Sequence, residues 1–182
     1  MTLTIEPFGW ARDLAPADLS AVTRIFNAVW AEWLPGEPPI SEAAYVDLDR
    51  FTAHPERVVR RLARDDQGRV VGHGNLHWRE GPGACVLKLL VDPDRRYEGV
   101  GRRLGGALTH EARANGRRGL TVEVADGSAA EAVSRAAGFR PDMVMEQNRT
   151  DPRAALPRLV PPAQLTQARP RYPGPCTKGS SG

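Results

Sequence analysis

The sequence predicts an α/β fold in which a mixed, mostly antiparallel sheet of about six strands includes one parallel crossover and packs against four helices. Three observations support this fold class. Strand-like segments separated by turn residues occupy the middle of the chain. A strand, a glycine turn, a helix and another strand follow over residues 84–124, which is the pattern of a parallel crossover. A further helix then leads to a last strand that begins at Phe139.

The first third of the chain predicts one strand and two helices. Leu3 and Ile5 alternate with polar residues, which indicates a strand over residues 2–6. From Pro16 onward the apolar residues fall on one face of a helix. Ser41 is a suitable N-cap for a second helix. The apolar positions are Leu19, Val22, Ile25, Phe26, Val29, Trp30 and Trp33 in the first helix and Ala44, Tyr45, Leu48 and Phe51 in the second.

The middle of the chain predicts a three-stranded meander followed by a helix and a fourth strand. The turn sequence at residues 65–68 separates the first two strands. The third is largely apolar, as expected for a central strand that is buried on both faces. Asn115 and Gly116 predict the end of the helix. The four strands are expected at residues 57–64, 69–79, 84–91 and 120–124.

The last part of the chain predicts a fourth helix, a closing strand and a tail. Ser128 and Glu131 form a capping-box sequence at the start of the helix, and Gly138 ends it. We expect residues 1–150 to form one domain that includes the closing strand. Residues 151–182 contain many prolines and no apolar periodicity, which predicts a basic, Pro-rich disordered tail.

Composition and charge exclude several classes of protein. The net charge is +3, but the tail after Asp151 carries +5, which leaves −2 for the remainder, so the basic face of a nucleic-acid-binding domain is not expected. The chain has no apolar run of about 18 residues and no signal-peptide pattern, which favours a cytoplasmic protein with no membrane partner. Cys85 and Cys176 form neither a disulfide framework nor a metal-binding motif, so no metal is expected.

The junction between the third strand of the meander and the next helix predicts a diphosphate-binding site. The first turn of a helix presents N–H groups without intrahelical partners together with the positive end of the helix dipole. Gly99 and Gly101 let the backbone come close to a bulky ligand. A dinucleotide-binding turn would need a third glycine where Leu104 stands, and no Gly-Lys-Ser/Thr sequence is present. Both nucleotide-binding interpretations are therefore weakened.

The pattern Arg96-x-x-Gly99-x-Gly101, preceded by Leu89-Leu90-Val91 and Pro93, resembles the acyl-CoA signature of the GNAT superfamily of N-acetyltransferases. A second similarity lies at Ala137-Gly138-Phe139, and a looser one links the chain to the first half of tandem two-domain members. The resemblance implies a GNAT-like fold with acetyl-CoA as co-substrate. It implies that the cofactor contacts Leu89, Leu90, Val91, Arg96, Tyr97, Glu98, Gly99, Val100, Gly101, Arg102 and Arg103.

The catalytic groups of the family are less evident. Ser134 stands where many members have a tyrosine acid, Gly127 replaces an asparagine, and Cys85 lies near the position of a glutamate base. The remaining candidates for the base are His73 and His77, which share one face of a strand with Asn75, and Glu80 at its end. The two histidines are alternatively structural residues of a half-exposed sheet face, and Cys85 a buried core residue.

The resemblance implies transfer of an acetyl group to the amine of a small molecule or a peptide amino terminus by direct attack. The alternative is a non-catalytic acyl-CoA-binding or partner-docking domain, favoured by the missing tyrosine, asparagine and glutamate. Trp30, Trp33 and Tyr45 either line an acceptor cleft or belong to the core. The hypothesis of a nucleic-acid-binding module is supported only by the basic tail and is the least favoured of the three functions. A homodimer is left open.

Overall fold

The computed structural model describes residues 2–52, 57–78 and 83–144. The chain divides into a compact unit of Met1–Arg140 and a second unit of Pro141–Gly182. Only the first four residues of the second unit are described, so the tail expected over residues 151–182 stays a prediction. No helix in the described part of the chain is both long and apolar enough to cross a membrane.

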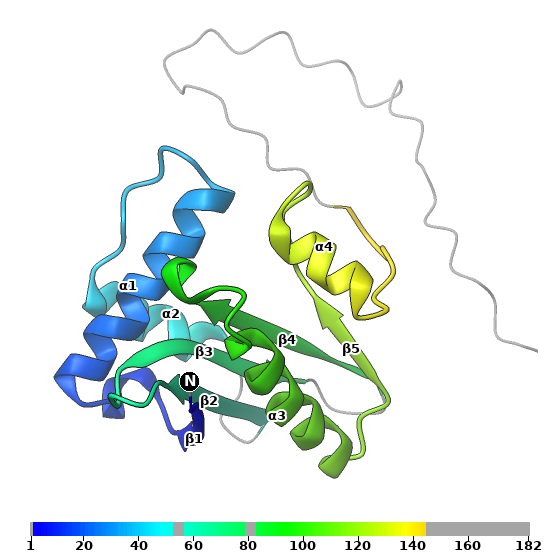
Figure 1. Cartoon of the computed structure of the whole chain (residues 1–182), viewed down its shortest axis with the longest axis horizontal. Coiled ribbons are helices and arrows are strands. Elements are labelled where there is room, and N and C mark those ends of the chain that lie inside the picture. Colours follow the sequence, from blue (N-terminus) through cyan, green and yellow to red (C-terminus); the bar gives the residue numbers. More distant parts are fainter. Residues whose placement is uncertain (1, 53–56, 79–82, 145–182) are drawn as a thin grey trace, which may run out of the picture. The chain divides into compact units, whose positions relative to one another are not determined.

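A single five-stranded sheet forms the centre of the first unit (Figure 1). The strands lie in the order of the sequence, and neighbours are antiparallel except for the last pair, which is parallel. The mixed, mostly antiparallel sheet with one parallel crossover is therefore confirmed. The strands are β1 (Thr4–Phe8), β2 (Val58–Arg64), β3 (Val70–His77), β4 (Ala84–Val91) and β5 (Gly119–Val122).

Four α-helices accompany the sheet, as predicted. The first two pack on one face of the sheet and α3 packs on the opposite face (Figure 1). Two single turns of 3-10 helix, η1 (Ala11–Asp13) and η3 (Pro93–Arg95), lie in the connections. The α-helices are α1 (Pro16–Trp33), α2 (Glu42–Thr52), α3 (Val100–Ala114) and α4 (Ala129–Ala136).

Three apolar clusters lie between these layers, and the smallest of them includes Val71 of β3 and Val100 of α3. On the α1 and α2 face, Val22, Ile25 and Tyr45 pack against Leu62 of β2. On the α3 face, the fully buried side chains of the helix pack against β3 and β4. Burial of each such aliphatic side chain contributes about 1.5–3 kcal/mol to the free energy of folding. The second cluster consists of Leu76, Cys85, Leu87, Leu104, Leu108 and Ala112.

The position of α3 depends on a close approach to β3. A Cβ atom at Gly74 would lie 2.7 Å from the carbonyl oxygen of Lys88 and 3.0 Å from Cδ1 of Leu108. A larger residue at Gly74 would push apart the neighbouring strand and the helix. Gly74 thus sets the distance between the sheet and the helix that begins at the glycine turn.

One predicted strand is not found. Residues 139–144 form neither helix nor strand, so the sheet of the described residues has five strands, and the remainder of the expected closing strand lies outside them. Local β propensity alone does not form a strand, because a strand is stable only when a neighbour supplies its hydrogen bonds.

Candidate functional site

The last two strands of the sheet separate before β4 ends. Pairing between β4 and β5 runs from Ala84↔Gly119 to Leu87↔Val122, whereas β4 continues to Val91 (Figure 1). Within the described part of the chain, no strand pairs with residues 88–91 on that edge. Buried backbone polar groups require partners. The second half of β4 therefore offers a backbone edge that an extended ligand can use.

The hydrogen-bond alternation of an antiparallel pair shows which peptide groups face this gap. The N–H of Asp92 donates to the carbonyl oxygen of Val71 at 3.0 Å, next to the pair Gly72↔Val91. Peptide groups that point to β3 alternate with peptide groups that point away from it. Those of Lys88 and Leu90 consequently face β3. The peptide groups of Leu89 and Val91 point into the gap between β4 and β5. The sequence predicted that residues 89–91 all contact the cofactor, but the peptide groups of Leu90 point to β3 and are not free for a ligand in the gap.

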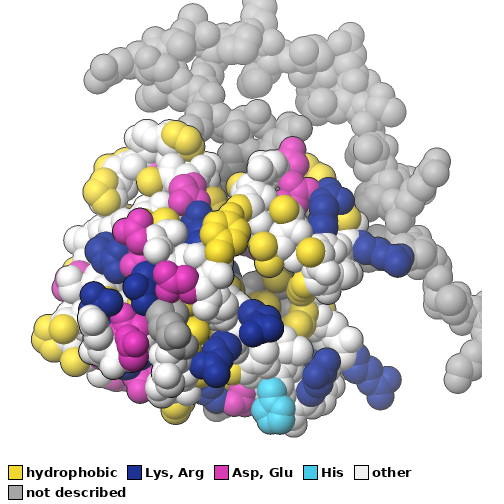
Figure 2. All heavy atoms as spheres, in the orientation of Figure 1, with side chains coloured by type: hydrophobic (Ala, Val, Ile, Leu, Met, Phe, Trp, Pro, Cys, Tyr) yellow, Lys and Arg dark blue, Asp and Glu magenta, His cyan; other side chains and the backbone are white. Residues whose placement is uncertain are grey.

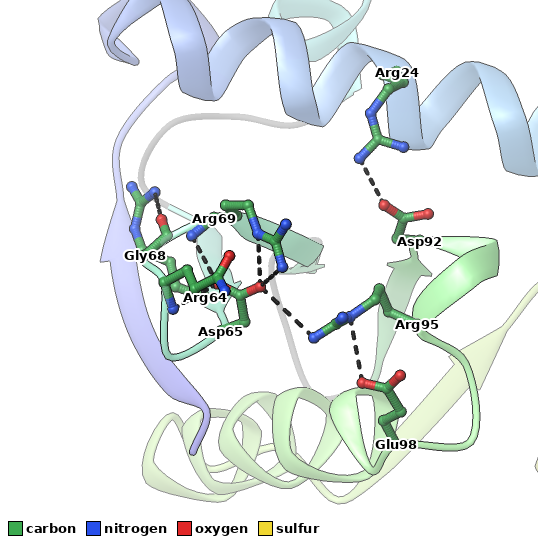
Figure 3. Close-up of polar contacts among 9 residues, drawn as sticks. Arg24, Arg64, Asp65, Gly68, Arg69, Asp92, Arg95 and Glu98 are labelled. Atoms are coloured by element: carbon green, nitrogen blue, oxygen red, sulfur yellow. Dashed lines mark hydrogen bonds and ion pairs between the residues drawn. The ribbon is translucent and has the colours of Figure 1, made fainter. Parts of the chain in front are cut away.

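After β4 the chain is fixed by charged side chains. Asp92 caps η3 by accepting the N–H of Asp94 at 3.3 Å, and it accepts a hydrogen bond from Arg24 of α1 at 2.6 Å (Figure 3). Burial would raise the pKa of Asp92, but these hydrogen bonds outweigh it and hold that pKa below its usual value. Asp92 is therefore ionised and ties the end of β4 to α1.

The guanidinium of Arg95 makes a second set of ion pairs. It lies 3.6 Å from Asp65, in the turn between β2 and β3, and 3.3 Å from Glu98 (Figure 3). The side chain of Asp65 is fully buried and is also bound by Arg69. These contacts hold the loop before α3 against the body of the sheet.

The N-terminus of α3 is left open by the protein. Gly99 is its N-cap, with a φ of +85°, and has no side chain to cap the helix. The first turn contains no acidic residue, and Tyr97 has a φ of +65°, which is uncommon outside glycine. The N–H of Arg96 donates to Pro93 and that of Arg103 to Gly99. Among the described residues, no protein acceptor binds the N–H groups of residues 97–102.

The three arginines near this turn differ in their surroundings. Arg96 pairs with Glu32 of α1 at 3.0 Å. The guanidinium of Arg103 donates to the carbonyl oxygen of Leu3 in the strand β1 region at 2.9 Å, so it fastens α3 to the N-terminal segment. Arg102 is exposed in the first turn of the helix. Arg102 is thus the side chain most available to an anion at this turn.

A small pocket of about 60 Å³ lies on the α1 and α2 face, beside the open edge of β4. Lys88 and Leu90, the neighbours of Leu89, both line it. Figure 2 has α3 toward the viewer, so the hollow that apolar side chains border near its middle is not this pocket; charged groups of both signs are intermixed to the left of that hollow. The pocket is lined by Phe26, Tyr45, Leu48, Asp49, His73, Gly74, Asn75, Lys88 and Leu90.

His73 is the predicted base that lines this pocket. Its side chain is 3% exposed, not half-exposed as the structural alternative assumed, because α2 covers this part of β3 and Tyr45 packs edge-on against the ring. The Nε2 atom of His73 has no hydrogen-bond partner among the described residues. Burial lowers the pKa of His73 to about 4, so the imidazole is neutral near pH 7.

The other predicted catalytic residues lie elsewhere. His77 shares a strand face with His73 and its Nδ1 is 3.3 Å from Oδ1 of Asn75, but it does not line the pocket. Burial, followed by the charge of Lys88, lowers the pKa of His77. Ser134 belongs to α4 and is not part of the pocket lining, and Glu80 lies outside the described residues.

Cys85 is a fully buried free cysteine. Burial raises the pKa of its thiol, which agrees with a core residue rather than with a reactive one. No group of side chains in the described ranges has the composition of a metal site.

Sequence reasoning missed several residues of the pocket. Asp49 accepts hydrogen bonds from Arg60 and from the N–H of Ala11, both at 2.9 Å. Lys88 and Phe26 reach the pocket from a strand and a helix that are distant in sequence. Rings in contact run from Trp33 through Trp30, Phe26 and Tyr45 to His73. Tyr45 is buried, in agreement with its interpretation as a core residue, and it also lines the pocket.

Comparisons with known protein families agree with this architecture. Residues 22–139 match the model of the acetyltransferase (GNAT) family. A mycothiol acetyltransferase of Acidothermus cellulolyticus is 33% identical over 175 residues, which are 95% of this chain and 50% of that protein. One from Stackebrandtia nassauensis is 31% identical over 87 residues, 48% of this chain and 28% of that protein. The chain spans half or less of the length of these relatives.

Solved structures share the fold. A tandem GNAT protein from the clavulanic acid biosynthesis pathway superposes with a TM-score of 0.62 at 28% identity, covering 75% of this chain and 43% of that one. A phosphinothricin acetyltransferase of Sinorhizobium meliloti, solved in complex with acetyl-CoA, superposes with a TM-score of 0.61 at 23% identity, covering 77% of this chain and 76% of that one.

Proposed function

Since this chain belongs to the acetyltransferase (GNAT) family, we propose that it is an acetyl-CoA-dependent N-acetyltransferase that acts on the amine of a small molecule or on a peptide amino terminus. The observation that carries the proposal is the uncapped N-terminus of α3, which lies directly after the half-unpaired strand β4. The names of the mycothiol acetyltransferases support a small-molecule amine as the acceptor.

The diphosphate of acetyl-CoA binds at the N-terminus of α3. The N–H groups of residues 97–102 provide donors, and the helix dipole adds an attraction of about 0.3–1 kcal/mol for a negative charge. Arg102, exposed in the first turn, adds a charge-assisted contact. Arg96 supports the turn through its pair with Glu32. The side chain of Arg103 has a structural role because it binds Leu3.

The pantetheine arm pairs with the open edge of β4 and thus replaces the missing strand. Leu89 and Val91 provide its peptide partners, because their N–H and C=O groups face the gap. One of these N–H groups faces the thioester oxygen and stabilises the oxyanion, an effect typically of about 3–4 kcal/mol. Fixing both substrates in one cleft supplies a further contribution by removing the entropy cost of their encounter.

The acceptor amine approaches from the pocket next to Leu89. Its nitrogen lone pair attacks the thioester carbon, the C–S bond of the tetrahedral intermediate breaks, and the acetamide and coenzyme A thiolate leave. Water takes up the proton that the amine loses. His73 lines the pocket, but its Nε2 atom is buried and its pKa of about 4 makes it a weak base, so we give it no proton-transfer step. His77, Glu80 and Ser134 stay predictions.

The second candidate function is a non-catalytic acyl-CoA-binding or partner-docking domain. The observation in its favour is Ser134, which stands in α4 at the position of the expected tyrosine acid. It agrees also with the chain spanning only half or less of its curated relatives. In this case the cleft binds acetyl-CoA without transferring the acetyl group.

Two measurements on the full chain decide between the functions. Isothermal titration with acetyl-CoA tests the binding site, and absence of binding at millimolar ligand contradicts both the enzyme and the acyl-CoA-binding domain. Release of the coenzyme A thiol across a panel of amines tests the reaction. Amine-dependent release supports the enzyme, whereas tight binding without release for any amine supports the binding domain.

A further inference from the structure

The pocket beside β4 contains one cationic side chain that its surroundings do not neutralise. Lys88 lines the pocket and makes no ion pair with any residue in the described part of the chain. Its direct neighbour on β3 is Asn75, which is uncharged. Lys88 therefore contributes an ammonium group to the pocket lining, and its neighbour on β3 does not neutralise it.

Asp49, the one carboxylate among the described lining residues, already has partners within the protein. Asp49 accepts a hydrogen bond from Arg60 with one oxygen and from the N–H of Ala11 with the other. Arg60 is buried, the Asp49 side chain is 9% exposed, and the two balance each other's charge. The described lining residues consequently leave a positive charge, which favours a ligand with a carboxylate over one with a second cation.

Apolar groups and size restrict the rest of the ligand. Phe26, Leu48 and Leu90 form apolar parts of the wall. The volume of about 60 Å³ is far below the roughly 300–1,000 Å³ of sites for drug-sized ligands. A small apolar side chain fits such a space.

We propose that the acceptor is a small α-amino acid, or a molecule that presents the same amine, carboxylate and apolar side chain. The carboxylate pairs with Lys88, the side chain lies against Phe26 and Leu90, and the amine lies beside Leu89. The Lys88 side chain lines the pocket, and the peptide group of the next residue, Leu89, faces the gap beside β4. This inference rests on the proposed function, because the latter places the thioester next to Leu89.

The test compares two ligands of the same shape, L-valine and L-valinamide, which differ in the carboxylate. Their binding to the full chain is measured by calorimetry, with and without coenzyme A, and their acetylation by thiol release. Three variants are compared with the wild type. Lys88→Met removes the charge at similar length, Lys88→Arg retains it, and Arg113→Met removes an exposed cation from the far end of α3 as a control.

We expect L-valine to bind at least 10-fold more tightly than L-valinamide. Lys88→Met removes this preference, Lys88→Arg retains most of it, and Arg113→Met leaves it unchanged. Equal binding of the two ligands, or an equal loss of both in Lys88→Met, overturns the inference, as does a failure of L-valine to bind the coenzyme A-loaded protein. Binding without acetylation, by contrast, counts only against the proposed enzyme activity.

Discussion

Helices α3 and α4 both begin after a glycine with positive φ, but their N-termini differ in whether side chains cap them. At α4, the hydroxyl of Ser128 accepts the N–H of Glu131 at 3.1 Å, and the carboxylate of Glu131 accepts the N–H of Gly127 at 2.8 Å. At α3, the N-cap is Gly99, which has no side chain, and no acidic residue lies in the first turn. One helix start is satisfied by the protein and the other is left open.

The difference shows where a ligand is needed. Orphan N–H groups at a helix start are normally satisfied by caps, water or ligands. A carboxylate in the first turn of α3 would occupy the donors and repel an anion, and α4 has such a group in Glu131. Hydrogen bonds from Arg135 and from the N–H of Gly127 lower the pKa of Glu131, so that carboxylate is ionised near neutral pH. The open start of α3 is the one that suits a diphosphate.

The largest expected effect comes from closing the open helix start with a negative charge. Gly99→Asp places a carboxylate at the N-cap of α3, and we expect acetyl-CoA to bind at least ~100-fold more weakly, which corresponds to about 2.7 kcal/mol. Titration calorimetry measures the change. Gly116→Asp is the matched control, because Gly116 lies just after α3, also has a positive φ and also has open space at its Cβ position.

The control separates charge from backbone strain. An aspartate with positive φ costs on the order of 1 kcal/mol at either position. Similar losses of thermal stability in both variants, with a loss of binding only in Gly99→Asp, support the comparison. Similar losses of binding in both would refute it.

A contrasting case is Nε2 of His73 in the pocket wall, which is buried and has no hydrogen-bond partner among the residues that the structure describes. The pKa of His73 is about 4 in the folded protein, compared with 6.5 in the unfolded chain. The folded protein therefore takes up a proton less readily, and its stability is retained above pH 6.5 and lost as the pH falls toward 4. We expect the free energy of unfolding to fall by about 3 kcal/mol over this range.

Urea denaturation between pH 7 and pH 4.5 measures this loss. His73→Phe keeps an aromatic ring against Tyr45 and removes the titrating group, so its unfolding free energy should depend less on pH than that of the wild type. Replacement of the exposed His110 by asparagine serves as the control. An unchanged pH dependence in His73→Phe contradicts the assignment of the buried neutral state.

The smallest effect is expected at the start of α4, where the protein's own side chains cap the helix. Ser128→Ala removes the cap of α4, which costs about 1 kcal/mol. Amide hydrogen exchange should show lower protection in α4, while the affinity for acetyl-CoA changes less than about twofold, well under 1.4 kcal/mol. A large loss of affinity would mean that the two helix starts do not act independently.

Local sequence signals predicted most of the fold. The glycine turn, the capping box at Ser128 and the turn at residues 65–68 all lie where the structure has them. These signals depend on backbone conformation and on hydrogen bonds between residues close in the sequence. The prediction of a closing strand was wrong for residues 139–144, because a strand forms only where a partner strand supplies hydrogen bonds, and the local sequence does not show whether one is present.

The pocket was less accessible to sequence reasoning. Periodicity placed His73 and Asn75 on one strand face correctly. It gave no information that α2 would cover His73, or that Asp49 and Lys88 would meet there. The outward direction of the Leu89 peptide group follows from the β3–β4 register, which only the assembled sheet defines. Contacts between distant segments therefore determined what the sequence missed.

The central claim is that the unoccupied N–H groups of residues 97–102 hold the diphosphate. Amide ¹H–¹⁵N spectra of the full chain, recorded during titration with coenzyme A, test it most directly. We predict that the largest shifts occur at residues 97–102 and at Leu89 and Val91, while the amides of Gly127 and Glu131 at the start of α4 stay in place. Binding of coenzyme A that leaves residues 97–102 unshifted would contradict the account.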